Sequence, residues 1–235
     1  MAFDLASAPT GETLLYAAAE MLFTSYKYAL FVILAFCVYY VAAKVTRGRR
    51  MQNLALLGLS YLFYALWDLR WCALLLGITA SGFIGGLLLG RVRSRRGLIL
   101  VAILLINLGA LGAFKYFGFF ADSFASLLGT VGLRADWVTL NLVLPIGISY
   151  YAFQNLSYVI DVYRRDEIAT SGVVEYATAL SFFPQLLAGP ITRPRDLLPQ
   201  LFARRAFDDA RARDGLRQVL WGLTKKMLIA DNIGV

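Results

Sequence analysis

The chain has 235 residues, of which 59% are hydrophobic and 16% are charged, and its formal net charge is +8. Soluble domains have roughly 45–50% apolar and about 25% charged residues, so this composition excludes an ordinary soluble protein. The basic residues fall in short clusters between uncharged blocks, which indicates membrane topology and argues against nucleic-acid binding. The chain has no histidine, and Cys37 and Cys72 lie inside apolar blocks, so neither a Ser-His arrangement nor a metal site is indicated.

Four apolar runs in the first half of the chain are long enough to cross a bilayer, which takes about 17–25 residues, and the first of them contains one charged residue, Lys27, near its outer end. They cover residues 21–43, 51–67, 71–90 and 97–114. Clusters of arginine and lysine follow the first and the third of these runs. The positive-inside rule assigns both clusters to the cytoplasm, so we expect the N-terminus and the connector 68–70 on the outer side.

Two further stretches predict amphipathic helices. Lys115 begins an expected outer segment, and apolar residues then recur at helical spacing over residues 117–131. This pattern predicts a helix in the outer interface, and a helix that caps the bundle fits it equally well. Residues 216–227 also carry an apolar face, which predicts a helix on the inner surface or the start of another crossing.

Residues 137–160 carry no charge, and we expect them to return the chain to the cytoplasm. Pro145 and Gly147 should break the outer third of this span. The remainder has a polar stripe, made of Ser149, Tyr150, Tyr151, Gln154, Asn155, Ser157 and Tyr158. Buried amides are costly in lipid, so the stripe should face protein or water, either as interhelical hydrogen bonds or as the lining of a polar path.

Residues 176–192 are apolar, yet two prolines, a glycine and a glutamine interrupt them. If this stretch crossed the membrane, the arginine-rich segment after it would lie outside, against the positive-inside rule. That segment contains Arg193, Arg195, Arg204, Arg205, Arg211, Arg213 and Arg217. We therefore predict that residues 176–192 dip into the membrane and return to the cytoplasmic face, with Pro184 and the Gly189-Pro190 pair forming the turn.

Several ordered motifs carry a resemblance to a known family. They are residues 144–149 (LPIGIS), 153–154 (FQ), 156–164 (LSYVIDVYR), 181–191 with Arg193, 222–223 (GL), 225–226 (KK) and 229–231 (IAD). Over these residues the chain resembles the membrane-bound O-acyltransferase family, most closely its bacterial alginate O-acetyltransferase branch. With the topology above, this implies an all-α polytopic membrane protein with about five transmembrane helices, a re-entrant segment and interfacial helices. We expect residues 1–235 to form a single membrane domain.

The resemblance implies transfer of an acetyl group from a cytoplasmic donor, acetyl-CoA or a similar acyl donor, to an extracytoplasmic glycan. It also implies a bacterial inner membrane, no resident cofactor and an extracytoplasmic hydrolase-like partner. The catalytic histidine of the family lies on a later segment and has no counterpart among these residues. We therefore assign no catalytic residue and expect the chain to be an N-terminal portion that is inactive alone.

The same resemblance implies a substrate channel, which we expect to be lined by Gln154, Gln185, Gly189, Pro190, Arg193 and Lys225. Arg193, Arg195, Lys225 and Lys226 could attract the phosphates of the donor, but for each residue anchoring on anionic lipid is the favoured interpretation. Two other functions stay open. One is a relative that transfers D-alanine to teichoic acid, and the other is a membrane transporter or scaffold without chemistry of its own.

Overall fold

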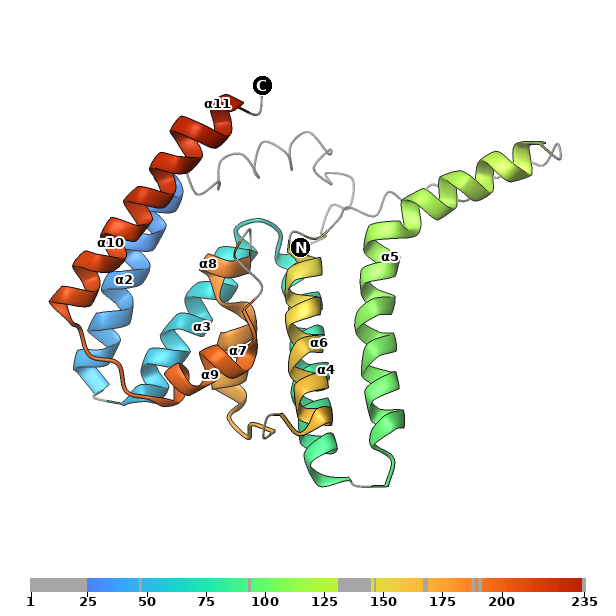
Figure 1. Cartoon of the computed structure of the whole chain (residues 1–235), viewed down its shortest axis with the longest axis horizontal. Coiled ribbons are helices and arrows are strands. Elements are labelled where there is room, and N and C mark those ends of the chain that lie inside the picture. Colours follow the sequence, from blue (N-terminus) through green and yellow to red (C-terminus); the bar gives the residue numbers. More distant parts are fainter. Residues whose placement is uncertain are drawn as a thin grey trace, which may run out of the picture. The chain divides into compact units, whose positions relative to one another are not determined.

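The computed structural model describes residues 25–46, 48–92, 94–130, 145, 147–166, 169–186, 189 and 192–233 (Figure 1). Every regular element in these ranges is helical, so the all-α prediction is confirmed for them. Three helical stretches are long and apolar enough to cross a membrane: Tyr26–Val45, Leu69–Arg91 and Arg96–Tyr116. The predicted total of about five crossings stays a prediction, as does the orientation of the N-terminus.

The chain forms two compact units, Met1–Gln52 with Arg204–Val235, and Asn53–Ala203. The prediction of one membrane domain is not tested by this division. The first unit contains α2 (Tyr26–Thr46) and the start of α3 (Arg49–Ala65), and then α10 (Asp209–Thr224), η1 (Lys225–Ala230) and α11 (Asp231–Ile233). The predicted helix over residues 216–227 is therefore confirmed. Its apolar side chains are exposed, and whether it lies on the membrane surface stays open.

In the second unit, α4 (Leu69–Arg91), α5 (Arg96–Thr130) and α6 (Ile148–Arg164) pack side by side (Figure 1). The contact face of α4 carries glycines where the neighbouring helices come closest. A Cβ at Gly86 would lie 2.6 Å from Cε1 of Tyr158, and one at Gly85 would overlap the side chain of Ile103. Small residues at such positions let helices approach closely enough for van der Waals contact to hold them together in lipid.

Helix α5 joins the fourth predicted span to the helix predicted after it. The predicted span 97–114 lies within the membrane-length stretch Arg96–Tyr116, and α5 continues unbroken to Thr130 with a bend part of the way along (Figure 1). The physical reason is local, because residues 115–130 contain no proline and no capping motif that would end a helix. The predicted helix over residues 117–131 is thus confirmed as helix as far as residue 130.

Helix α6 begins where the sequence predicts a break. Gly147 adopts the left-handed conformation with φ of 74°, and α6 starts at Ile148. A Cβ at this position would be strained by the backbone angle and would also overlap the carbonyl oxygen of Leu186. At the other end, Arg96 Nη2 donates to the carbonyl oxygens of Val162 and Tyr163 at 2.8 and 2.9 Å, which satisfies two terminal carbonyl groups.

The interrupted stretch forms a helical hairpin, defined here as α7 (Val173–Ser181), α8 (Phe183–Leu186) and α9 (Pro194–Phe202). Helix α7 breaks at Phe182, one residue before α8, and Pro184 occupies an early position of α8 where a proline needs no backbone donor. Nine residues of helix span about 14 Å, less than half of the roughly 30 Å of a bilayer core. Since α7 packs against α9, the chain turns back on itself after this short excursion.

Candidate functional site

Two polar side chains of α3, Asn53 and Ser60, hydrogen-bond to the hairpin at two levels along the axis of α3. At the hairpin mouth, Asn53 Nδ2 donates to Glu175 Oε1 at 3.2 Å and to the carbonyl oxygen of Leu201 at 3.0 Å. These two acceptors belong to the start of α7 and the end of α9, so the hairpin enters and leaves at the same level. Farther along α3, Ser60 Oγ accepts from the backbone N–H of Phe183 at 3.2 Å.

Asn53 and Ser60 are seven residues apart on one helix, a separation of about 10 Å along its axis. The hairpin therefore extends over roughly a third of the thickness of a bilayer core before it returns. The break at Phe182 excludes one unbroken helix over residues 173–186, and α9 packs back against α7. The predicted re-entry of residues 176–192 into a membrane and their return to the cytoplasmic face stay predictions.

The hairpin tip, which we define by the described residues 183–186, 189 and 192, is organised around Gln185. Its Oε1 accepts from the hydroxyl of Tyr150 on α6 and from the hydroxyl of Thr192, each at 3.0 Å. The backbone N–H of Gly189 donates to the carbonyl oxygen of Gln185 at 3.0 Å and closes the turn. A Cβ on Gly189 would lie 2.7 Å from Cα of Gln185, which explains why the turn needs a glycine.

The amide of Gln185 is held in one orientation by the hydrogen bonds to its oxygen. Two hydroxyl donors converge on its oxygen, while its Nε2 makes no hydrogen bond to any residue that the structure describes. The side chain is half-buried. An oriented amide N–H can bind a carbonyl or hydroxyl oxygen of a ligand. Tyr150, Gln185 and Thr192 include no general base near neutral pKa, so this arrangement suits binding better than proton transfer.

Asn155 belongs to a different cluster, which joins four helices. Its Nδ2 donates to Asn107 Oδ1 at 2.8 Å and to the carbonyl oxygen of Ile78 at 3.0 Å, and its Oδ1 accepts from the hydroxyl of Tyr176. All three polar side chains of this cluster are 0% exposed. The interpretation of the polar stripe as interhelical hydrogen bonding is therefore confirmed for Asn155, which links α4, α5, α6 and α7.

Gln154 lies between α6 and α7 and is also 0% exposed. Its Nε2 donates to the carbonyl oxygen of Ala179 at 3.4 Å, and its Oε1 has no hydrogen-bond partner among the described residues. The side chain does not reach an open surface in this structure. It lies one helical turn from Tyr150 and thus next to the hairpin tip along α6.

The other residues predicted for the channel are only partly brought together. Gln185 and Gly189 lie in the same turn, and Arg193 is exposed at the start of α9, where its carbonyl oxygen accepts from the N–H of Asp196. Pro190 is outside the described residues. Lys225 lies in the first unit, exposed in η1, and the hairpin lies in the second.

Sequence reasoning missed the residues that anchor the hairpin. Asn53, Ser60 and Asn107 lie inside runs that were interpreted only as apolar spans, and Glu175 precedes the predicted segment. A signal was present in the sequence, because an uncharged polar residue within a lipid-spanning run is costly unless it finds a partner. Its partner could not be identified, since Asn53 and Leu201 are 148 residues apart.

Comparison with known proteins gives several relatives. The chain is 39% identical over 191 residues to the probable alginate O-acetylase AlgI of Pseudomonas aeruginosa, and the match covers 79% of this chain and 36% of the relative. It is 36% identical over 210 residues to the probable alginate O-acetylase AlgI of Pseudomonas putida, and this match covers 88% of this chain and 42% of the relative. It is 28% identical over 231 residues to a peptidoglycan O-acetyltransferase of Helicobacter pylori, and this match covers 86% of this chain and 43% of the relative.

The chain thus spans about two fifths of the length of the relatives it matches. No protein-family model and no solved structure matches it. The similarity to the alginate O-acetylases nevertheless extends over most of the chain and agrees with the ordered motifs noted in its sequence. The chain belongs to the membrane-bound O-acyltransferase family, in the branch of the alginate O-acetylases.

Proposed function

We propose that this chain forms part of a membrane enzyme that transfers acetyl groups to the hydroxyl groups of an alginate-type polysaccharide. The observation that carries the proposal is the 36–39% identity, over 79–88% of the chain, to proteins named alginate O-acetylase. The donor is acetyl-CoA or a similar acyl donor on the cytoplasmic side, and the acceptor is on the other side. The protein lies in a bacterial inner membrane with its N-terminus outside and works with an extracytoplasmic hydrolase-like partner.

The hairpin tip supplies binding in this proposal. The N–H groups of Gln185 Nε2 bind an oxygen of the acyl donor or of the sugar, and Tyr150 and Thr192 hold the amide in place. Gly189, Pro190 and Arg193, in the same unit, extend the lining around this amide. The general base is not among these side chains, because the chain contains no histidine.

A second acceptor is favoured by one specific observation. The relative from Helicobacter pylori is named a peptidoglycan O-acetyltransferase, and its match covers 86% of this chain. Peptidoglycan is therefore the alternative acceptor, although the identity of 28% is lower than that of the alginate relatives. A D-alanine transferase and a transporter without chemistry have no comparable support.

A chimera tests the proposal. The matching stretch of the Pseudomonas aeruginosa relative is replaced by this chain, and acetyl groups on secreted alginate are measured. We expect acetylation to be retained, to fall about tenfold or more in Gln185→Ala, and to be unchanged in Phe153→Ala, whose exposed side chain serves as a matched control. A chimera that inserts at normal levels but acetylates no alginate contradicts the acceptor. An unchanged rate in Gln185→Ala contradicts the role of that amide.

A further inference from the structure

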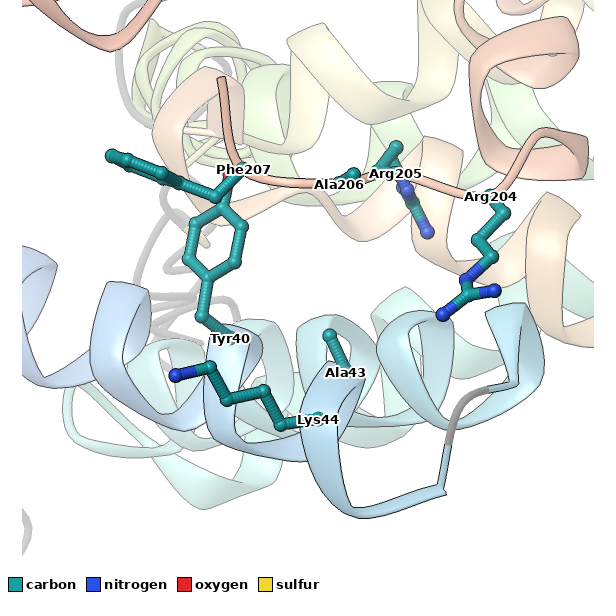
Figure 2. Close-up of a pocket in the computed structure, with 7 residues that line it drawn as sticks. All are labelled: Tyr40, Ala43, Lys44, Arg204, Arg205, Ala206 and Phe207. Atoms are coloured by element: carbon teal, nitrogen blue, oxygen red, sulfur yellow. The ribbon is translucent and has the colours of Figure 1, made fainter. Parts of the chain in front are cut away.

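A pocket in the first unit is separate from the hairpin and has no role in the function proposed above. It lies between the C-terminal end of α2 and the extended segment 204–207, and its volume is about 350 Å³ (Figure 2). Its lining consists of Tyr40, Ala43, Lys44, Arg204, Arg205, Ala206 and Phe207. Sites for small organic ligands occupy roughly 300–1,000 Å³, so this pocket can hold a small ligand or a headgroup.

The wall formed by segment 204–207 is held in place by a buried glutamine. Gln52 Nε2 donates to the carbonyl oxygen of Arg205 at 2.7 Å, and Gln52 Oε1 accepts from the N–H of Arg205 at 3.3 Å. Gln52 is only 1% exposed. The guanidinium carbon of Arg205 also lies 5.4 Å from the ring centroid of Tyr39, within the range of a cation–π contact. The pocket therefore has a fixed wall, although its segment has no regular secondary structure.

Three cationic side chains line this pocket, Arg204 and Arg205 at one end and Lys44 extending toward Tyr40 (Figure 2). Figure 2 shows the side chains of Arg204 and Arg205 pointing from the segment toward the helical ribbon that carries Ala43, with Lys44 on the same ribbon. Among the described residues, neither Lys44 nor Arg204 forms an ion pair. Their charge is thus available to an anion.

The nearest acidic side chains along the chain are engaged elsewhere. They follow the segment directly and pair with arginines of α10, Asp208 with Arg211 at 3.7 Å and Asp209 with Arg213. Asp208 also caps α10 by accepting from the N–H of Arg211 at 3.0 Å. Both carboxylates that directly follow the segment are thus engaged with arginines of α10, and neither belongs to the lining of the pocket.

One side of the pocket is aromatic. The rings of Tyr40 and Phe207 meet edge to face, with their centroids 5.3 Å apart. Such a wall contacts the organic part of a ligand, whereas the arginines bind oxygen atoms of a phosphate through paired N–H donors. Inorganic phosphate alone would leave the aromatic wall unused.

We propose that this pocket binds a phosphate group carried on an organic molecule, with Lys44, Arg204 and Arg205 as its cationic ligands. Under the predicted topology Lys44 is cytoplasmic, where two sources offer this chemistry: the headgroup of an anionic phospholipid and a soluble phosphate ester such as coenzyme A. The inference does not depend on the proposed function, because either source satisfies it.

The test measures binding to the full chain in a neutral detergent, by titration with dihexanoyl phosphatidylglycerol, with coenzyme A and with inorganic phosphate. We expect saturable binding of at least one of the two organic phosphates and weaker binding of inorganic phosphate. The double variant Lys44→Gln/Arg204→Gln should lower the affinity for whichever organic phosphate binds by roughly tenfold or more, because two charged hydrogen-bond donors are removed. Binding of the lipid alone identifies a headgroup site, and binding of coenzyme A alone identifies a soluble ligand.

The matched control is Arg95→Gln/Arg217→Gln, which removes the same charge from two exposed arginines outside the pocket. It should leave both affinities unchanged. If the first double variant does not fold, Ala43→Phe keeps every cation and fills the pocket, and it should weaken binding as well. The proposal is overturned if neither organic phosphate binds saturably, if both double variants weaken binding equally, or if folded Ala43→Phe binds like the wild type.

Discussion

Gly82 on α4 provides the sharpest test of how the helices of the second unit are held together. A Cβ added at this position would overlap Asn155 Oδ1 and the hydroxyl of Tyr176, which are hydrogen-bonded to each other inside the four-helix cluster. Gly77 lies on the same helix, and a Cβ added there meets nothing within 4 Å. The substitutions Gly82→Ala and Gly77→Ala therefore add the same methyl group to one helix in two different surroundings.

The expected effects have opposite signs. Gly77→Ala should stabilise the protein by up to about 1 kcal/mol, because alanine is the better helix former. Gly82→Ala gains the same amount but displaces the Asn155 amide, which weakens two or three buried hydrogen bonds at about 1 kcal/mol each. Overpacking adds about 1–3 kcal/mol. The net result should be a destabilisation of about 2–5 kcal/mol.

Unfolding of the purified chain in mixed detergent, followed by loss of helical circular dichroism, measures both variants. Tyr176→Phe removes one of the two overlapping atoms, so the cost of Gly82→Ala should be smaller in that background, as a double-mutant cycle would report. If Gly82→Ala is as stable as Gly77→Ala, the described packing of α4 against the Asn155 cluster is wrong.

Three further predictions concern the hairpin. Gly147→Ala should destabilise the protein by about 1–2 kcal/mol, because the φ of 74° at this position disfavours a side chain and the added Cβ would overlap the carbonyl oxygen of Leu186 in α8. A thermal unfolding midpoint equal to that of the wild type would contradict this prediction. Asn53→Leu removes the donor to the buried carboxylate of Glu175 and should lower the free energy of chemical unfolding by about 2–3 kcal/mol. An unchanged free energy of unfolding would show that this contact does not anchor the hairpin mouth. In a background without Cys37 and Cys72, single cysteines at Ser171 and Gln200 should react with an impermeant thiol reagent from the same face of the membrane; labelling from opposite faces would mean that the hairpin crosses.

Sequence alone was sufficient where the deciding interactions are local. The break before α6 was predictable because Pro145 fixes φ and lacks a backbone N–H, while Gly147 can adopt the left-handed conformation that other residues avoid. The helical face over residues 216–227 follows from spacing along a single helix. Charge placement predicted that the chain turns back after residue 176, because arginines are costly to move across a membrane.

The change in polarity at residue 115 does not interrupt the helix. Backbone hydrogen bonds continue through polar residues unless a proline or a cap ends them, so the predicted span and the predicted amphipathic helix form the single helix α5. Polarity indicates which solvent a helix meets, and it does not by itself end the helix.

Only the tertiary structure decided which polar groups meet. Asn155 and Gln154 are neighbours in the sequence and belong to the same polar stripe, yet one joins four helices through its hydrogen bonds and the other has a partner for its amide nitrogen alone. Their environments depend on groups contributed by α4, α5 and α7, which lie tens of residues away. A sequence shows that a buried amide needs a partner, and the partner is determined only when the helices pack.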